Sequence, residues 1–250
     1  MFQPAFHPRP AEPLQLPHVW RGRELAQARE RTVPTGHAAL DAHLPGGGWP
    51  LGSLVEVLQD QPQRHVWQLM LPALAAVARS AGQPVVLVSP PFEPFLPSLR
   101  AQGLPGEQVL WIGADKPPAR LWAAEQALRC ADVSAVLAWL PVARSEELRR
   151  LHLCAQQHER LLVVFRPQQV AGQSSPARLR LLVQGREQME VTLLKRRGPP
   201  LLQPVVLRGT PPRLAALLGA RKQRRHPAPV PAPLPEASHA LDRIASLHSG

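Results

Sequence analysis

The sequence contains no tyrosine and only two cysteines, Cys130 and Cys154, neither of which belongs to a Cys-x-x-Cys pair. A disulfide framework is therefore not expected, which fits a reducing compartment. The first twenty residues hold five prolines and no apolar run, so no secretory signal is predicted. No stretch of the sequence approaches the roughly 18 uninterrupted apolar residues that a membrane span requires. We therefore expect a cytoplasmic protein that makes no contact with a membrane.

Acidic residues are absent between Lys195 and Arg225, a stretch that carries nine basic residues out of a formal net charge of +11. Three interpretations remain open for this stretch: a solvated charged face, a site for the phosphate backbone of DNA, and a contact for an acidic protein. No aromatic residue is interleaved with the charges, so a stacking platform for single-stranded bases is not supported. The candidate contacts with DNA or a partner are Lys195, Arg196, Arg197, Arg221, Lys222, Arg224 and Arg225.

A glycine loop at residues 46–48 joins a short helical turn to an apolar run. Pro45 ends the turn, and the three glycines allow backbone conformations that other residues resist. Pro50 and Gly52 predict a second tight corner, and residues 54–58 predict a short buried strand. We expect the rest of the chain to be organised around this loop, corner and strand.

Strands and helices alternate through the middle of the chain. The predicted helices are 63–80, 94–102, 117–130 and 145–158, and the predicted strands between and after them are 84–89, 108–112, 133–140 and 161–165. This alternation favours a mainly parallel sheet with right-handed crossovers. Further strands at 178–184, 189–195 and 201–207, the first two joined by a turn at 185–186, predict an antiparallel end of the sheet. The predicted fold class is therefore α/β, with helices flanking a twisted sheet.

Three segments are predicted along the chain. Residues 1–17 read as a disordered, proline-rich arm, and 18–210 as one α/β domain that begins with a helix at 18–31. Residues 211–250 read as a basic, proline-rich tail in which 226–235 form a polyproline-type linker. The linker would present one weak apolar stripe as a candidate partner contact, made by Leu241, Ile244 and Leu247.

The segment 35–56 resembles the approach to the first sheet strand in RecA-like ATPases. Its matching positions are Thr35, Gly36, Leu40, Asp41, Leu44, Gly46, Gly47, Gly48, Pro50, Gly52 and Glu56. The resemblance implies a RecA-like core, in which a phosphate loop of the form G-x-x-x-x-G-K-[ST] should follow the strand. Such a loop needs glycines, a lysine for the terminal phosphates and a hydroxyl for Mg²⁺.

The residues that follow this strand do not supply a phosphate loop. Residues 59–66 contain no glycine, lysine, serine or threonine, and Pro62 removes one backbone donor. The corresponding loop positions are occupied by Gln59, Asp60, Gln63 and Arg64. The side chain of Arg64 would replace the lysine as a point charge but would not supply the cradle. A nucleotide cofactor is therefore not expected.

Other RecA-like catalytic positions are also changed. Trp139 stands near the place of the Mg²⁺-organising aspartate, and Ser89 and two prolines stand where the catalytic glutamate should follow its strand, with Glu93 too late. The strand that should end in a polar sensor ends in Arg166 and a proline. Because phosphoryl transfer depends on positioning and charge neutralisation, we predict that the protein is not an enzyme.

The remaining histidines, cysteines and tryptophans suggest no further chemistry. His152 and Cys154 lie two residues apart on a predicted helix and point apart, so no metal site is expected. Most of the six tryptophans are predicted to pack in the core. Trp49 is the exception, because its place in the glycine loop suggests that it caps the cleft or touches a partner.

Six pieces of the sequence, in order, resemble the ImuA family, whose members are RecA-related bacterial proteins grouped with the SulA-like cell-division inhibitors. The pieces are residues 44–58, 71–75, 121–129, 135–141, 148–156 and 193–198. The resemblance implies an accessory role in SOS-induced, error-prone translesion DNA synthesis at the nucleoid. It implies contacts with an ImuB-like polymerase-related protein and an error-prone replicative-type DNA polymerase, with RecA and DNA as further candidates. A SulA-like division inhibitor and a DNA-dependent RecA-type ATPase are the alternatives.

Overall fold

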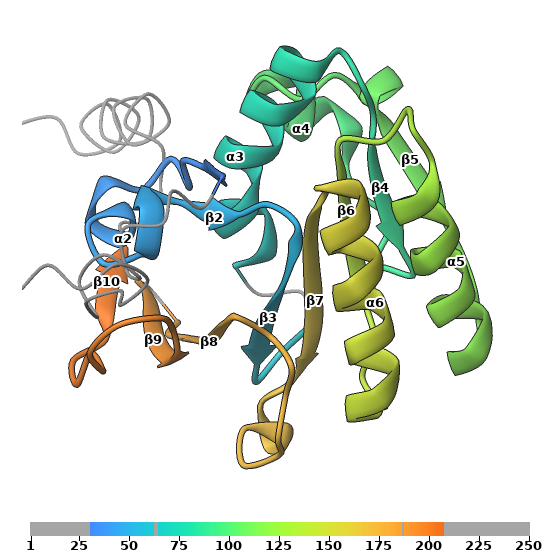
Figure 1. Cartoon of the computed structure of the whole chain (residues 1–250). Helices are drawn as coiled ribbons and strands as arrows, with labels where there is room; N and C mark the ends of the chain where they lie inside the picture. The colour runs from blue at the N-terminus through green and yellow to red at the C-terminus, as the bar shows by residue number, and fades with distance from the viewer. Residues whose placement is uncertain (1–30, 63–64, 187, 208–250) are drawn as a thin grey trace, which may run out of the picture. The chain divides into compact units, whose positions relative to one another are not determined.

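The computed structural model describes residues 31–62, 65–186 and 188–207 (Figure 1). The chain divides into two units, Met1–Gly209 and Thr210–Gly250, and all described residues belong to the first. The predicted arm at 1–17, nearly all of the helix predicted at 18–31, and the tail after 207 lie outside the described residues. Among the residues that the structure describes, no helix is both long and apolar enough to cross a membrane.

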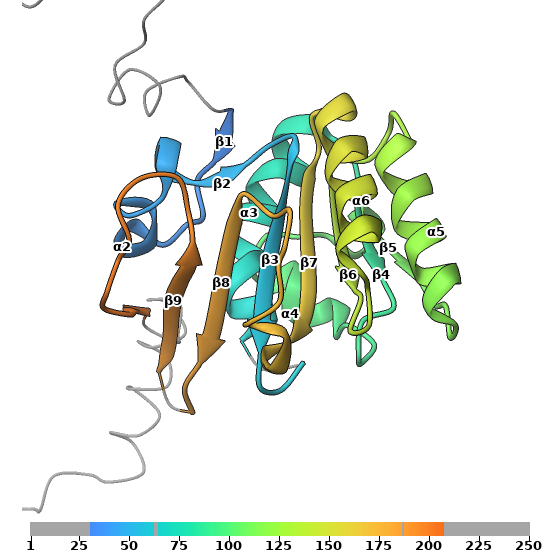
Figure 2. The same cartoon turned by 60° about the horizontal axis from the view of Figure 1, so that its bottom comes forward.

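An eight-stranded sheet in the order β10-β9-β8-β3-β7-β6-β4-β5 forms the centre of the described part (Figure 2). Its strands are β3 (Ser53–Gln59), β4 (Val85–Val88), β5 (Val109–Ile112), β6 (Ala135–Trp139), β7 (Leu161–Pro167), β8 (Leu179–Gln184), β9 (Met189–Lys195) and β10 (Val205–Leu207). Strands β3 to β8 run parallel, whereas β9 is antiparallel to both β8 and β10. The predicted mainly parallel sheet with an antiparallel end is confirmed, and its likeness to RecA remains an interpretation.

The helices cover both faces of the sheet (Figure 2). The main ones are α3 (Val66–Ala81), α4 (Leu96–Ala101), α5 (Pro117–Arg129) and α6 (Ser145–His158). Helices α3 and α4 share one core cluster with Val55 and Val57 of β3, and α5 and α6 share the other with Leu54. This division follows from the alternation of side chains along a strand. All four helices were predicted from the sequence, and their observed ends fall within a few residues of the predicted ones.

The glycine loop folds back on the start of the domain. Here α2 (Ala38–Asp41) and a 3-10 turn (Pro45–Gly47) lead into β2 (Trp49–Pro50), which pairs with β1 (Thr32–Val33). A Cβ atom on Gly48 would lie 2.2 Å from the carbonyl oxygen of Val33, so only glycine fits there. The prediction for Trp49 was wrong: its side chain is fully buried in the core, because pairing with β1 turns the indole inward.

A buried ion cluster joins three neighbouring strands. The carboxylate of Glu56 in β3 accepts hydrogen bonds from Arg166 of β7 at 2.8 Å and from Arg180 of β8 at 2.7 Å. The three side chains are at most 7% exposed. Arg166 also donates to the carbonyl oxygen of Ala143, and Arg180 to that of Val170, each at 2.7 Å. The cluster therefore fixes the segments that follow β6 and β7 to the centre of the sheet.

We predict that Glu56→Gln lowers the free energy of unfolding by about 3–5 kcal/mol, because it leaves two guanidinium groups buried without their counter-charge. Chemical denaturation of the purified protein measures this loss. The matched control is Glu107→Gln, at an exposed position, which should change stability by no more than about 0.5 kcal/mol. Equal denaturation midpoints for the two variants would contradict the role given to the cluster.

Candidate functional site

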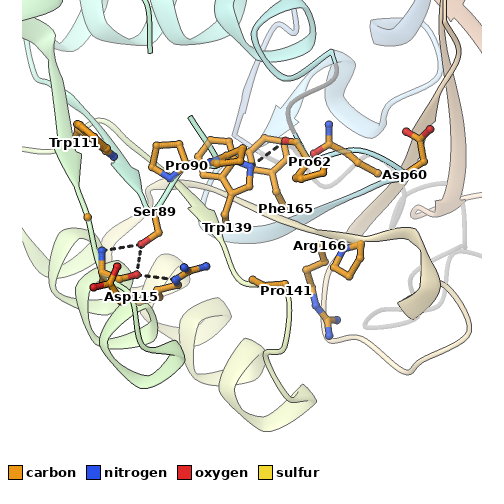
Figure 3. A pocket seen from close by; sticks show the side chains of 16 residues that line it. Asp60, Pro62, Ser89, Pro90, Trp111, Asp115, Trp139, Pro141, Phe165 and Arg166 are labelled. Carbon is orange, nitrogen blue, oxygen red and sulfur yellow. Dashed lines mark hydrogen bonds between the residues drawn. The ribbon is translucent and has the colours of Figure 1, made fainter. Parts of the chain in front are cut away.

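A pocket of about 420 Å³ lies at the carboxyl ends of the parallel strands (Figure 3). Residues at or after the ends of β3, β4, β5, β6 and β7 line it. Ligands of open α/β sheets bind in this crevice. The structure thus brings together several residues that the sequence singled out, namely Gln59, Asp60, Ser89, Trp139 and Arg166.

An aromatic pair forms part of the pocket wall. The rings of Trp139 and Phe165 stack with centroids 4.6 Å apart and planes inclined by 17°. The indole N–H of Trp139 donates to the carbonyl oxygen of Pro62 at 3.3 Å, which holds the segment after β3 next to the indole (Figure 3). The place near which a RecA-like ATPase holds a metal-binding carboxylate therefore presents aromatic carbon.

The segment after β3 carries a carboxylate to the pocket. Asp60 lines the pocket and accepts the backbone N–H of Gln61 at 2.8 Å. Gln63 and Arg64, the other predicted loop positions, lie outside the described residues. His65 begins α3, and its ring lies 3.0 Å from the amide oxygen of Gln68 and 2.8 Å from the carbonyl oxygen of Gly185. A negative charge at Asp60 repels an anionic phosphate.

Ser89 at the end of β4 makes a structural clamp. Its hydroxyl donates to the carbonyl oxygen of Ala114 at 2.9 Å and accepts the N–H of the same residue at 3.0 Å. Arg120 donates to the same carbonyl oxygen at 2.8 Å. Glu93 is exposed and borders a smaller neighbouring cavity instead of this pocket. The position expected for a catalytic base thus holds a serine that ties β4 to the segment after β5.

Arg166, at the expected sensor position, reaches the pocket from β7 while its guanidinium pairs with Glu56. Sequence reasoning missed other lining residues, among them Asp115 and Arg120, which come from the segment after β5. No spacing pattern in the sequence could have placed them here, because Asp115 lies in the loop before α5 and Arg120 in the first turn of that helix.

Several aromatic side chains are exposed, and two of them border the pocket or the cavity next to it. The prediction that most tryptophans pack in the core was wrong for Trp111 and Trp122, which are 50% and 64% exposed. Trp111 lies on the edge strand β5, where one side of the strand has no neighbour in the sheet. Phe92 and Phe95 are even more exposed, at 63% and 71%. Trp111 and Phe92 border adjoining cavities that share Pro90 and Pro91.

A second pocket, of about 450 Å³, lies at the opposite end of the strands, where β3 and β8 begin and β9 ends. Lys195, Arg196 and Arg197, all predicted contacts, line it together with Arg178. Sequence reasoning missed Arg178, which lies far from the others in sequence. The remaining predicted contacts lie outside the described residues: Arg221, Lys222, Arg224, Arg225, Leu241, Ile244 and Leu247.

His152 of α6 lies near this basic end. Its Nδ1 accepts the backbone N–H of Leu54 at 3.0 Å, which requires an unprotonated Nδ1. Burial lowers the pKa of His152 below its ordinary value of 6.5, and the positive charges of Arg178 and Lys195 lower it further. The neutral imidazole is therefore the form that the fold stabilises.

The two cysteines are both free, and burial raises the pKa of the Cys154 thiol. No group of three or more histidine, cysteine or acidic side chains suited to a metal ion occurs within the described ranges. Cys130 is exposed just after α5.

Comparison with known proteins finds similarity to one protein family over part of the parallel region of the sheet. A sequence model of the family described as "Cell division inhibitor SulA" matches residues 52–162, from β3 to the start of β7. The chain is also 28% identical over 120 residues to a protein of Edwardsiella piscicida named cell division inhibitor SulA. That similarity covers 48% of this chain and 71% of the relative. Both findings show that part of this chain is similar to proteins described as the cell division inhibitor SulA.

The lowered pKa of His152 predicts a loss of stability in acid. The folded state binds a proton at His152 more weakly than the unfolded state does. The stability that the neutral imidazole contributes is therefore fully present above pH 6.5, and it is lost as the pH falls below 6.5 toward the lowered pKa. Denaturation midpoints between pH 7.5 and 5 should show this fall. In the His152→Gln variant the denaturation midpoint should depend less on pH. The control variant His158→Gln, on the same helix, should keep the pH dependence of the unsubstituted protein. An unchanged profile in His152→Gln would contradict the interpretation.

Proposed function

We propose that this protein is a non-catalytic, RecA-like accessory protein of SOS-induced, error-prone translesion DNA synthesis. It acts by contact with other proteins in the cytoplasm, at the nucleoid. Its partners under this proposal are an ImuB-like polymerase-related protein and an error-prone replicative-type DNA polymerase, with RecA and DNA as further candidates.

The observation that carries the non-catalytic part is the composition of the strand-end pocket. Triphosphate binding and phosphoryl transfer need backbone donors, a cation and a metal ligand held toward the phosphates. The pocket instead presents the Trp139–Phe165 stack, proline rings and the carboxylate of Asp60. Of its two guanidinium groups, that of Arg166 is paired with the buried carboxylate of Glu56, and that of Arg120 donates from Nε to the carbonyl oxygen of Ala114. This chemistry favours neither a nucleotide nor a metal ion.

The exposed aromatic residues support a role in protein contact. Phe92, Phe95 and Trp111 are each at least half exposed; Trp111 lies on the edge strand β5, and Phe92 borders a cavity that adjoins the pocket of Trp111. Aromatic side chains are enriched at the centres of protein interfaces, and exposed apolar groups that gather in one place mark interaction sites.

The translesion part rests on the ordered sequence pieces that resemble ImuA. One of them, residues 193–198 at the end of β9, lies beyond residues 52–162, which the SulA family model matches. The resemblance of this basic strand end to ImuA is therefore independent of the SulA family match, and it favours the translesion role.

Inhibition of cell division is the second candidate function. The similarity to the family and to the relative, both named as division inhibitors, favours it. Both candidates act by contact with other proteins. A test in cells distinguishes them because mutagenesis and cell division can be scored separately.

We predict that deleting the gene lowers damage-induced mutation frequency to the level of cells that lack the ImuB-like protein, and that deleting both has no further effect. Overproduction should leave cells dividing. The measurement is mutation frequency after ultraviolet irradiation, with cell length scored by microscopy. Division arrest on overproduction, with unchanged mutagenesis in the deletion strain, would refute the proposal and favour the division inhibitor.

The C-terminal tail is our proposed contact arm, because its sequence carries basic residues, a proline-rich stretch and then the apolar residues Leu241, Ile244 and Leu247. We predict that truncation after Gly219 abolishes capture of the ImuB-like protein in a pull-down. Serine substitutions at Leu241, Ile244 and Leu247 should do the same if these residues form the docking stripe. Capture that survives both changes would place the contact on the core, where Trp111→Ala tests it.

A further inference from the structure

The second pocket combines four cationic residues from two strands. Arg178 precedes β8, Lys195 ends β9, and Arg196 and Arg197 follow it; β9 pairs antiparallel with β8. Antiparallel pairing brings the start of one strand beside the end of the other, so residues far apart in sequence border one groove. The remaining lining comes from the glycine loop and from residues 176–179, and it includes no acidic side chain among the described residues.

Arg196 differs from its neighbours because it is tied to its own chain. Its guanidinium donates to the carbonyl oxygens of Pro199, at 3.0 Å, and of His43. These bonds join the segment after β9 to the loop that follows α2, which keeps the groove in shape. Arg196 is therefore a positioning residue.

The other three cations have donors to offer a ligand. Lys195 is exposed and donates one hydrogen bond, to the carbonyl oxygen of Ser175 at 2.9 Å, out of the three its ammonium can make. Arg178 and Arg197 are exposed; each makes an interaction within the protein, and a guanidinium carries five N–H donors. Glu159 is an acidic residue whose backbone lies beside Gly52, at the same end of the sheet. Its carboxylate pairs with Arg31 and not with the cations of the groove.

We infer that this groove binds the phosphate backbone of duplex nucleic acid through Arg178, Lys195 and Arg197. Such binding needs cations, and the groove offers them. A protein partner needs buried aromatic or aliphatic anchors, and the lining offers only small residues, prolines and the buried Leu179. Without aromatic rings in the groove, stacking of single-stranded bases is disfavoured.

The sequence that follows the groove extends the same charge. No acidic residue occurs in the sequence from Val191 to Pro235. The inference deepens the proposed function by naming DNA as a ligand of the core, yet its test in vitro does not depend on translesion synthesis.

The test compares two full-length triple variants that each lose three positive charges. One carries Arg178→Gln, Lys195→Gln and Arg197→Gln; the control carries Arg100→Gln, Lys116→Gln and Arg149→Gln, at exposed positions outside the groove. Binding to a 20-base-pair duplex is measured by fluorescence anisotropy over a series of salt concentrations. The groove variant should bind roughly tenfold more weakly and lose about 0.9 of salt slope for each phosphate contact removed. The control should lose little of either.

Several outcomes would overturn the inference. Equal loss of affinity in both variants would mean a diffuse charge effect, and retained DNA binding in the groove variant would place any DNA contact elsewhere. Loss of capture of the ImuB-like protein with intact DNA binding would make the groove a site for an acidic protein. Should the triple variant unfold, Arg178→Gln alone, at an exposed position before β8, is measured against Arg149→Gln by the same criteria.

Discussion

The pairing of Glu56 with Arg166 and Arg180 is the constraint on which the rest of the structure depends. Burying three charges is costly unless each is paired and its remaining donors are satisfied. Here the two guanidinium groups also bond to backbone carbonyls after β6 and β7, so one cluster fixes the central strand and one wall of the strand-end pocket. Glu56 belongs to the sequence pattern that resembles RecA, and in this chain its contacts are structural.

This constraint separates two ends of one sheet. At the carboxyl ends of the parallel strands, Arg166 is turned to the cluster, and Trp139 stacks on Phe165 next to the segment after β3. At the other end, where β9 returns antiparallel, cations gather around the glycine loop. A fold that commonly binds ligands at its strand ends thus holds a nearly buried aromatic pair there and positive charge at the opposite end. Our proposal assigns contact functions to both surfaces in place of catalysis.

Much of this arrangement could be predicted from the sequence. Alternating apolar runs with glycine and proline boundaries located every strand of the main sheet and its four flanking helices. Residues of the pocket could be predicted only where the end of a strand could be predicted. Asp60, Ser89 and Trp139 follow or end predicted strands, and so they were expected at one edge of the sheet. Trp49 could not be placed, because its burial depends on pairing between β1 and β2, strands too short to show a pattern. Arg178 joins Lys195 only through antiparallel pairing, which local sequence does not reveal.

The most direct measurement of the central claim, that the strand-end pocket does not work as a nucleotide site, is a calorimetric titration with Mg·ATP combined with an assay of phosphate release. The account predicts no saturable heat of binding and no phosphate release, with or without duplex DNA. Saturable binding at micromolar ATP, with DNA-stimulated turnover that Arg64→Ala abolishes, would contradict it and would identify an active RecA-type ATPase.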